Sequence, residues 1–486
     1  MTRTNPDSCP GVLRLHQAAD GPLARIRLPG GRLEPRQLQS LAEAALELGD
    51  GNIELTSRGN VQLRQVRDAA ALSERLAGAG LLPSDTHERV RNIVASPLSG
   101  RIGGWADVHA LVPALDLGLR AATRLAELPG RVLFTLDDGR GDISGLGGDI
   151  GVHATDADEF ALVLAGRDAG IRVSTADAVP VMLAAAHAFL DLGSDQWRLH
   201  EVDDGARRVI DILGLSPGLE RLEFGATHDI PIGWLDQENG LVSLGAAVRL
   251  GSLSARIAEF IAAIERPIFI TPWRSLVITD LEEWPAEQVV RVLAPMGLIF
   301  DANSPWLHVS ACAGRPGCAK ALTDVRADAT AAVESGRVAP TNQPAADSDT
   351  NGHATEPDRP TSNLDSTATD PAAPAPNMAS ASSAVPDLGP AIELRSADDV
   401  MVAGRQHWSG CDRRCGRPRG LVTDIVATEN GYRITEDTKQ ATDRLRIAPP
   451  TPKLGTPVVS TGPAADAGAA GPRAIPQPPT TATESG

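Results

Sequence analysis

The amino-acid sequence predicts an α+β protein arranged as a pseudo-twofold repeat, and three observations support this fold class. A small unit of strands and one helix occurs near the N-terminus and again in the middle of the chain. Four of the five cysteines form two close pairs in the C-terminal half. Two long segments contain almost no large apolar residues, so they cannot bury enough surface to offset the entropy of ordering. The chain therefore divides into repeated folded parts, an insertion and a tail.

The first copy of the repeated unit lies within residues 22–66. Alternating apolar residues in PLARIRL, residues 22–28, predict a strand, and the glycine pair that follows marks a turn. A helix begins at Pro35, carries its leucines and alanines on one face, and ends before Gly49. The segment NIELTSRGNVQLRQV then predicts two strands joined by a short turn.

The second copy lies within residues 231–281 and repeats this order. The segment PIGWLDQENGLVSLGAAVRLG predicts two strands, and a helix begins near Ser252. The segment PIFITPWRSLVITDL predicts the second pair of strands, in which Thr271 aligns with Thr56 of the first copy. Two copies of one α+β unit predict a pseudo-twofold pair of half-domains.

A longer segment of mixed character follows each copy. The first contains the strand RVLFTLDD and the glycine-rich run GRGDISGLGGDIGVHA, and the second contains both cysteine pairs. The predicted folded parts are residues 10–75, 85–215, 225–290, and 300–330 together with 390–446. We expect the insertion, residues 331–389, and the tail, residues 447–486, to be disordered because both are rich in Ala, Pro, Ser and Thr.

Composition excludes several classes of protein. No uninterrupted apolar run reaches the roughly 18 residues of a membrane-spanning helix, so no membrane partner is expected. The N-terminal segment MTRTNPDSCPGVLRLHQ lacks the apolar core of a signal peptide, so we expect a cytoplasmic protein with reduced thiols. The net charge of -17 argues against a nucleic-acid partner.

The two cysteine pairs predict an iron-sulfur cluster. Five residues separate Cys312 from Cys318 and three separate Cys411 from Cys415, and four thiolates are the usual ligands of a 4Fe-4S cluster. A zinc-stabilised binding protein is an alternative, although structural zinc sites favour pairs separated by two residues. Cys9, the fifth cysteine, is interpreted as a free thiol without a role.

Arginine supplies almost all of the positive charge. The only lysines are Lys320, Lys439 and Lys453, so an anion site formed by the first 319 residues has to use arginine. A guanidinium group binds a carboxylate through two parallel hydrogen bonds, which suits a ligand with several carboxylates. Codon bias toward arginine is an alternative explanation of the same composition.

Five motifs together resemble the siroheme-dependent sulfite and nitrite reductase superfamily, and most closely its precorrin-3B synthase branch. They are RIRLPGG at 25–31, LTSRGNVQL at 55–63, RNIV at 91–94, TPWR at 271–274, and the cysteine pairs in order. The resemblance covers residues 10–330 and 390–440. It implies two ferredoxin-like half-domains and two 4Fe-4S α/β domains of the nitrite/sulfite reductase type, with a tetrapyrrole at their junction.

The resemblance also implies the residues of the site. The cluster ligands would be Cys312, Cys318, Cys411 and Cys415, and in siroheme enzymes the last of these thiolates also bridges to the haem iron. The residues expected to contact the tetrapyrrole are Arg27, Arg58, Asn60, Gln62, Arg91 and Arg131. Arg274 is expected to pack as a pseudo-symmetric counterpart rather than to bind.

One departure separates the synthase branch from the reductases. Siroheme reductases use basic side chains, including lysines after a Leu-Pro motif, to bind and protonate a small anion. In this chain LPGRVLF supplies Arg131, and Leu133 occupies the place of the second cation. Arginine is a poor proton donor because its pKa exceeds about 12. The sequence therefore favours the synthase over the alternative, a siroheme-dependent nitrite or sulfite reductase.

The synthase branch implies a monooxygenase of aerobic cobalamin biosynthesis. Its substrates would be precorrin-3A and dioxygen, its reaction hydroxylation with lactone formation, and its electron donor NADH-linked or a ferredoxin. The resemblance further implies a mononuclear non-haem iron, and His87, His153 and His407 are its candidate ligands. A lone histidine is more often a packing or capping residue, and the sequence identifies no catalytic residue.

Overall fold

The computed structural model describes residues 7–193, 195–225, 230–339, 392–394, 396–400 and 402–435. The predicted tail and most of the predicted insertion lie outside the described residues. The first part of the predicted insertion is folded, because α8 (Val325–Glu334) and β17 (Val338–Ala339) continue past residue 331. Ala332 and Val333 of α8 are buried in a hydrophobic core, so the predicted start of the insertion is nine residues too early.

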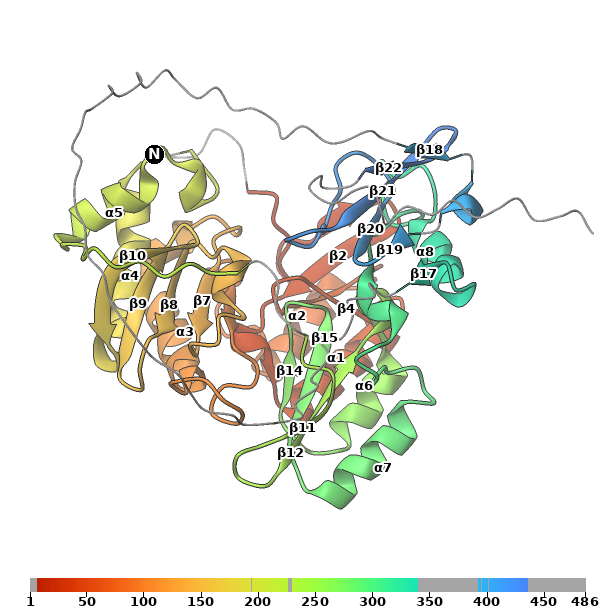
Figure 1. Ribbon diagram of the computed structural model, residues 1–486, viewed down its shortest axis with the longest axis horizontal. Coiled ribbons are helices and arrows are strands. Elements are labelled where there is room, and N and C mark those ends of the chain that lie inside the picture. The colour runs from red at the N-terminus through yellow and green to blue at the C-terminus, as the bar shows by residue number, and fades with distance from the viewer. Residues whose placement is uncertain are drawn as a thin grey trace, which may run out of the picture. The chain divides into compact units, whose positions relative to one another are not determined.

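The two copies of the repeat form two antiparallel five-stranded sheets (Figure 1). The first copy comprises β1 (His16–Ala18), β2 (Gly21–Ile26), α1 (Pro35–Leu48), β4 (Asn52–Leu55), β5 (Val61–Leu63) and α2 (Ala69–Gly78). The second comprises β11 (Gly233–Asp236), β12 (Val242–Ala247), α6 (Ala255–Ala262), β14 (Ile268–Ile270), β15 (Ser275–Leu281) and α7 (Glu283–Leu293). Helices α2 and α7 end three residues beyond the predicted ends of the half-domains at 75 and 290.

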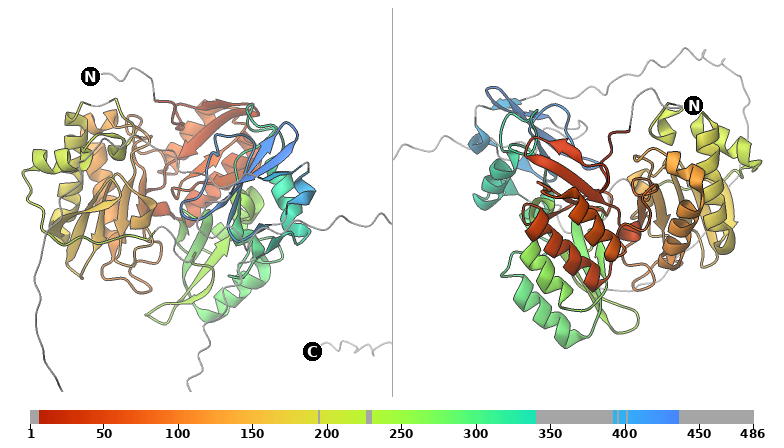
Figure 2. Two further views of the ribbon diagram at one scale, coloured as in Figure 1. Left: turned by 45° about the horizontal axis from the view of Figure 1, so that its top comes forward. Right: turned by 180° about the vertical axis from the view of Figure 1, so that it is seen from behind.

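Each half-domain completes its sheet with a strand from the other copy. Strand β3 (Arg32–Leu33) pairs with β14 of the second copy, and β13 (Ser252–Ser254) pairs with β4 of the first. The strand orders are therefore β1-β2-β5-β4-β13 and β11-β12-β15-β14-β3. Helices α1 and α6 lie side by side, as the red and green helices of Figure 2 show from behind. The two half-domains consequently share one hydrophobic core.

Equivalent turns of the two copies have equivalent backbone conformations. Positive φ angles of 65° and 50° occur at Gly30 and Leu250, just before the exchanged strands, and angles of 63° and 58° occur at Gly59 and Arg274 in the hairpin turns. Arg274 therefore aligns with Gly59 rather than with Arg58. A Cβ atom on Gly31 would lie 2.1 Å from the carbonyl oxygen of Ile270, so only glycine fits where β3 begins.

The segment after the first copy forms a mixed sheet in the order β10-β9-β8-β7-β6 (Figure 1). Its strands are β6 (Ile93–Ala95), β7 (Phe134–Asp137), β8 (Ile150–Ala154), β9 (Glu159–Leu164) and β10 (Arg167–Ser174), of which the first three are parallel. Helices α3 (Leu111–Ala121), α4 (Thr175–Asp191) and α5 (Gly205–Leu213) complete its core.

The segment after the second copy forms a sheet of the same kind in the order β16-β20-β21-β22-β18. Its strands are β16 (Val309–Ala311), β18 (Ile392–Leu394), β20 (Gln406–Ser409), β21 (Thr423–Thr428) and β22 (Gly431–Thr435), and β19 (Val402–Ala403) pairs with β17. Strands β16, β20 and β21 are parallel. Among the described helices, none has the length and apolar character needed to cross a bilayer.

Candidate functional site

Two of the four paired cysteines lie beyond the carboxyl ends of neighbouring parallel strands. Cys312 follows β16 directly, and Cys411 lies two residues beyond the end of β20. The backbone N–H of Gly410 donates to Cys312 Sγ over 3.2 Å, and the Cys312 N–H donates to the carbonyl of Trp408 over 3.0 Å. The parallel pairing of β16 with β20 thus brings residues from two distant parts of the sequence together.

Tight turns carry the other two cysteines. The Cys318 N–H donates to the carbonyl of Gly314, and Arg414, with a φ of 47°, donates its N–H to the carbonyl of Cys411. A Cβ atom on Gly410 would lie 2.5 Å from Ala321 Cβ, so the two cysteine loops are in close contact. Burial raises the pKa of the Cys415 thiol, and charge repulsion from the three other paired cysteines raises it further. The four cysteines lie together, and none is in a disulfide.

The number of thiols gathered here suits either kind of metal centre. Four thiolates can hold a single tetrahedral zinc ion or occupy the four corners of a 4Fe-4S cluster.

His407 lies beside the cysteines but does not act as an ionisable group there. It is fully buried on β20, and its Nδ1 is 2.9 Å from the hydroxyl of Ser310. Burial, together with repulsion from the nearby Arg274, lowers the pKa of His407 to about 3, although an interaction with the backbone of Cys415 opposes this shift. His407 is therefore a neutral ring that lies against the loop carrying the last of the four thiols.

The three candidate iron ligands lie in three different surroundings. His87 contacts the hydroxyls of Ser84 and Thr86 through Nδ1 and the Ala122 carbonyl through Nε2. His153 contacts Ser144 and Asp137 in the sheet that follows the first copy, whereas His407 is on β20. The residues proposed from sequence therefore do not form a mononuclear iron site, and we derive no chemistry through one.

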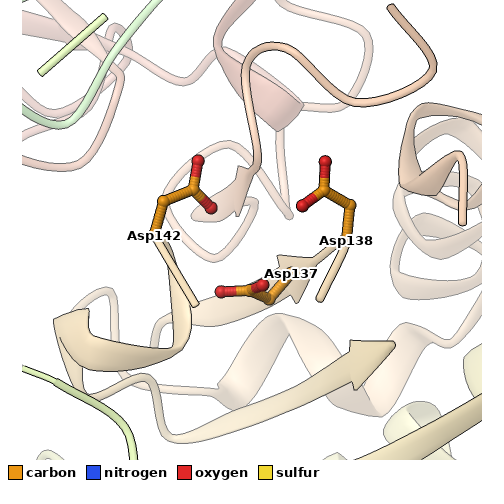
Figure 3. A group of neighbouring side chains, drawn as sticks. All are labelled: Asp137, Asp138 and Asp142. Atoms are coloured by element: carbon orange, nitrogen blue, oxygen red, sulfur yellow. The ribbon is translucent and has the colours of Figure 1, made fainter. Parts of the chain in front are cut away.

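An acidic trio near the glycine-rich run could be mistaken for a metal site. Asp137, Asp138 and Asp142 point toward one another with ligand atoms within 4.8 Å (Figure 3). Asp137 accepts four backbone N–H groups of the loop that follows, and Asp138 is paired with Arg140 over 2.6 Å. Burial tends to raise the pKa of Asp137, but hydrogen bonds from His153 and the backbone outweigh it and hold the pKa below its usual range. The trio shapes the loop and lacks free ligand atoms on Asp137.

A second group of side chains is rich in positive charge. Its members are Arg25, Arg27, Arg58, Arg198 and Arg419, which we call the arginine group. They come from β2, from the β4–β5 turn, and from the segments after α4 and after Cys415. Burial lowers the pKa values of Arg27, Arg58 and Arg419, and repulsion from other members lowers them further. Like charges held together in this way favour the binding of an anion.

Arg27 is the most deeply buried member of the group. Its side chain is 3% exposed, and its Nη2 donates only to the carbonyl of Pro10, over 3.3 Å. Its Nε and Nη1 have no hydrogen-bond partner among the described residues. Burial, aided by repulsion from Arg25, lowers the pKa of Arg27 to about 9. An unpaired guanidinium group at this depth requires a carboxylate or similar acceptor that the described residues do not supply.

The other members differ in how well they are paired. Arg198 bonds Asp149 over 2.6 Å, and Arg25 bonds only the neutral side chain of Gln62. The guanidinium groups of Arg58 and Arg419 make no hydrogen bond or ion pair with a described residue, and Arg419 lies against Gly147. Sequence reasoning chose Arg27 and Arg58 but missed the other three. The position of Arg419, four residues after Cys415, was a usable signal.

Two polar residues of the first hairpin have structural partners. Asn60 is buried, accepts the N–H of Leu28 at Oδ1 and donates from Nδ2 to Asn92, so it joins three of the motifs. Gln62 accepts from Arg25 and donates to Glu54 over 2.6 Å. The structure therefore gives Asn60 a structural role, and Gln62 holds a member of the arginine group in place.

Arg91 and Arg131, also predicted to touch the ligand, differ from the arginine group. Arg91 is buried and forms two hydrogen bonds with Asp116, of 2.5 and 3.1 Å, so its charge is already neutralised. Arg131 is exposed and lies over the ring of Trp197, 5.7 Å from its centre. Arg131 can still reach a ligand at the surface, whereas Arg91 would first have to leave Asp116.

Leu133 occupies an apolar environment. It is 4% exposed and packs with Val94 and Ile143, and Trp273 lies against the same cluster. A lysine here would bury its ammonium group among apolar side chains, which costs several kcal/mol. The apolar surroundings of this position are therefore as unsuited to a second cation as the leucine itself.

Hydrogen bonds and ion pairs connect the hairpins of the half-domains to the cysteine loops. Arg25 of the arginine group takes part through Gln62, which donates to Glu54. Glu54 of β4 is paired with Arg326 over 2.6 Å, and Arg64, which follows β5, donates to the carbonyl of Gly317 over 2.9 Å. Arg326 also donates to the carbonyl of Cys312 over 3.3 Å, and Arg274 donates to the carbonyl of Gly416. These bonds fix the hairpins of both half-domains against the loops that carry the thiols.

Comparison with known families and curated proteins gives the following. The family described as "Nitrite/Sulfite reductase ferredoxin-like half domain" matches residues 16–79. A precorrin-3B synthase of Sinorhizobium is 25% identical over 343 residues, which is 67% of this chain and 73% of that protein. A ferredoxin--nitrite reductase of Synechococcus elongatus is 34% identical over 127 residues, but the match spans only a quarter of that enzyme's length.

Comparison with solved structures supports the fold. The structure of the Mycobacterium tuberculosis NirA protein superposes with a TM-score of 0.62 at 17% identity, over 85% of this chain and 73% of that one. Identity at this level is evidence for a shared fold and does not carry the activity. The predicted α+β repeat is confirmed by the two interlocked half-domain sheets together with this likeness.

Proposed function

We propose that this chain, which belongs to the nitrite/sulfite reductase superfamily, is a precorrin-3B synthase. In this proposal it uses dioxygen to hydroxylate precorrin-3A and to form the lactone of precorrin-3B, a step of aerobic cobalamin biosynthesis. The observation that carries the proposal is Arg27, whose buried guanidinium group has no carboxylate partner among the described residues. It belongs to a group of arginines that is linked to the loop of Cys312 by the bonds from Arg25 through Gln62, Glu54 and Arg326.

The arginine group suits a ligand with several carboxylates. Arg25, Arg27, Arg58 and Arg419 form no ion pair with a described residue. Precorrin-3A carries acetate and propionate side chains around its rim, and each can accept two parallel hydrogen bonds from a guanidinium fork. Such a ligand would satisfy the free donors of Arg27 and reduce the repulsion within the group.

The four cysteines would hold a 4Fe-4S cluster, which supplies single electrons to the site when bound. Gly410 is placed to donate a hydrogen bond toward this group, because its backbone N–H already donates to Cys312 Sγ. The chain's own contribution to the reaction is to bind and orient the macrocycle by its rim. The proposed electron donor, an NADH-linked protein or a ferredoxin, remains a prediction from the resemblance.

A siroheme-dependent nitrite or sulfite reductase is the second candidate. The 34% identity with a ferredoxin--nitrite reductase over 127 residues favours it. The apolar surroundings of Leu133 weigh against it, because reduction of nitrite or sulfite needs several protons and this position cannot supply one. The deeply buried, neutral His407 does not replace that donor.

Turnover of the purified protein distinguishes the two candidates. The protein is isolated without air, its cluster is reconstituted, and it is given a chemical reductant with precorrin-3A, in air or under argon. The proposal expects loss of precorrin-3A in air alone, and no loss with a Cys415→Ser variant. Consumption of nitrite or sulfite with siroheme absorption bands, and no action on precorrin-3A, would instead identify the reductase.

A further inference from the structure

We propose that residues 7–13, which we call the N-terminal strap, form a wall of the tetrapyrrole site, and that the Cys9 side chain contacts the bound ligand. The inference rests on the proposed function only for the class of ligand, a polycarboxylate tetrapyrrole. It gives a role in binding to a cysteine that the sequence alone marks as a free thiol without one.

The strap is fixed at both ends to the segment after the first half-domain. Asp7 accepts the N–H of Gly130 over 2.7 Å and pairs with Arg89 over 3.2 Å. The N–H groups of Val12 and Leu13 both donate to one oxygen of Glu88, over 2.6 and 3.1 Å. Because these contacts lie on either side of Cys9, the thiol has a defined position.

The middle of the strap lies against Arg25 of β2 and against Arg27, which follows that strand. The carbonyl of Gly11 accepts the N–H of Arg25 over 3.2 Å, and the carbonyl of Pro10 accepts from Arg27 Nη2 over 3.3 Å. Cys9 immediately precedes these two residues. Residues 9–11 therefore border the place where the free donors of Arg27 must find a partner.

The strap packs closely against Glu88 and Gly130. A Cβ atom on Gly11 would lie 2.3 Å from a carboxylate oxygen of Glu88, and one on Gly130 would lie 2.9 Å from Cys9 Cβ. Glycine at both positions lets the strap approach the domain closely. The Cβ atom of Cys9 thus lies against Gly130, and its thiol is within electrostatic reach of Arg25, Arg27 and Arg58.

The Cys9 thiol is a neutral group. Burial raises its pKa, and the charge of Asp7 together with a hydrogen bond to that carboxylate raises it further, so the group remains protonated near neutral pH. A neutral S–H group beside Arg27 can approach a carboxylate without repulsion, whereas a thiolate would compete with the ligand for the arginines.

Protection from alkylation tests the contact directly. The probe is uroporphyrin, a stable tetrapyrrole with acetate and propionate side chains, and its affinity is first measured by fluorescence. Iodoacetamide labelling of Cys9 is then followed by mass spectrometry of the tryptic peptide TNPDSCPGVLR. With free uroporphyrin at about ten times its Kd, we expect labelling to slow about tenfold, in proportion to the free fraction of sites.

A second cysteine controls for general effects of the probe. Ser216 is exposed beyond α5, and a Cys9→Ser/Ser216→Cys protein should label at the same rate with or without uroporphyrin. Slowed labelling at Cys9 alone supports the strap as a wall. Tight binding with unchanged labelling of Cys9 overturns the inference and leaves the proposed function intact. Absence of any uroporphyrin binding would contradict both the inference about the strap and the proposed function.

A matched pair of variants provides an independent measurement. Cys9→Asp places a negative charge beside Arg27, and Cys9→Asn introduces a side chain of nearly the same shape without the charge. We expect Cys9→Asp to weaken uroporphyrin binding at least about tenfold relative to Cys9→Asn. The new carboxylate would pair with the guanidinium groups and compete with the carboxylates of the ligand. Equal affinities of the two variants, with equal melting temperatures, would contradict the contact.

Discussion

Unpaired positive charge is the feature of individual residues that most constrains the function. Arg27 and Arg91 have the same side chain and similar burial, at 3% and 5% exposed. Asp116 neutralises Arg91 through two hydrogen bonds, whereas Arg27 has only one carbonyl contact. The charge of Arg91 is therefore used within the fold, whereas the charge of Arg27 is available to a ligand.

Replacing each of these arginines by methionine should have opposite effects. Arg27→Met removes a buried, unpaired charge, so we expect unchanged or higher thermal stability and uroporphyrin binding about 10- to 100-fold weaker. Arg91→Met leaves Asp116 with only Arg120, so we expect a lower melting temperature and little change in affinity. Melting curves and fluorescence titrations measure both quantities. Weaker binding by Arg91→Met alone would place the ligand elsewhere.

Asp142 should make stability depend on pH. Burial, together with repulsion from Asp137, raises its pKa to about 7. A carboxyl group whose pKa is raised on folding contributes stability below its unfolded pKa, and this contribution is lost as pH rises through about 7. Between pH 6 and 8 the loss is about 1 kcal/mol.

Asp142→Asn should remove that dependence. The amide oxygen can still accept the hydrogen bond from Ser96, so the variant should gain stability over the wild type at pH 8 more than at pH 6. Urea unfolding at the two pH values measures the difference. Parallel pH profiles of the two proteins would show that Asp142 is already ionised throughout this range.

The sequence revealed some site residues and concealed others for identifiable reasons. Arg27 and Arg58 stand in the motifs RIRLPGG and LTSRGNVQL, so a motif was enough to choose them. The contact of Asn60 with Asn92 joins parts of the chain more than 30 residues apart, so its structural role was hidden. Cys9 was hidden because nothing near it in sequence indicates that it comes within electrostatic reach of three arginines.

At the scale of elements, the exchanged strands determine how the half-domains hold together. Strands β3 and β13 have only two and three residues, yet each completes the sheet of the other copy. The alternation of apolar residues predicted the strands that carry the motifs. It could not predict the exchange, because a short strand has the same local pattern whichever sheet it joins.

Glycine at position 31 should be essential for this exchange. Both Gly31 and Gly51 have positive φ angles, of 72° and 87°, so alanine is strained at either position. Only at Gly31 would the new methyl group meet a backbone atom, the carbonyl oxygen of Ile270, whereas Gly51 has open space. We expect Gly31→Ala to cost at least about 2 kcal/mol more than Gly51→Ala. Equal losses in thermal unfolding would contradict the close approach.

At the scale of the whole molecule, the cysteine pairs meet despite the long sequence between them. Strands β16 and β20 pair in parallel, and α8 and β17 belong to the same folded part. Composition predicted that the intervening segment adds no core, but it placed the boundary within α8. The end of this helix was missed because its alanine-rich residues, AAVES, have the same composition as the segment that follows.

Two deletions test this boundary. Removal of residues 341–389 leaves every described element in place, so the cluster should assemble and show its absorbance. Removal of residues 331–389 also removes the end of α8 and all of β17, including the buried Ala332 and Val333, and should impair assembly. Equal cluster content in the two proteins, from iron analysis, would show that these elements do not support the thiol loops.

In the proposed reaction, the tetrapyrrole in this site is the substrate of an oxygenation. Turnover of precorrin-3A with isotopically heavy dioxygen, followed by mass spectrometry of the product, tests this directly. We expect the wild type to form a product that contains one oxygen atom from dioxygen, and Arg27→Met to lose this activity. A product without label, or precorrin-3A left unchanged by a protein that binds siroheme and reduces nitrite, would contradict it.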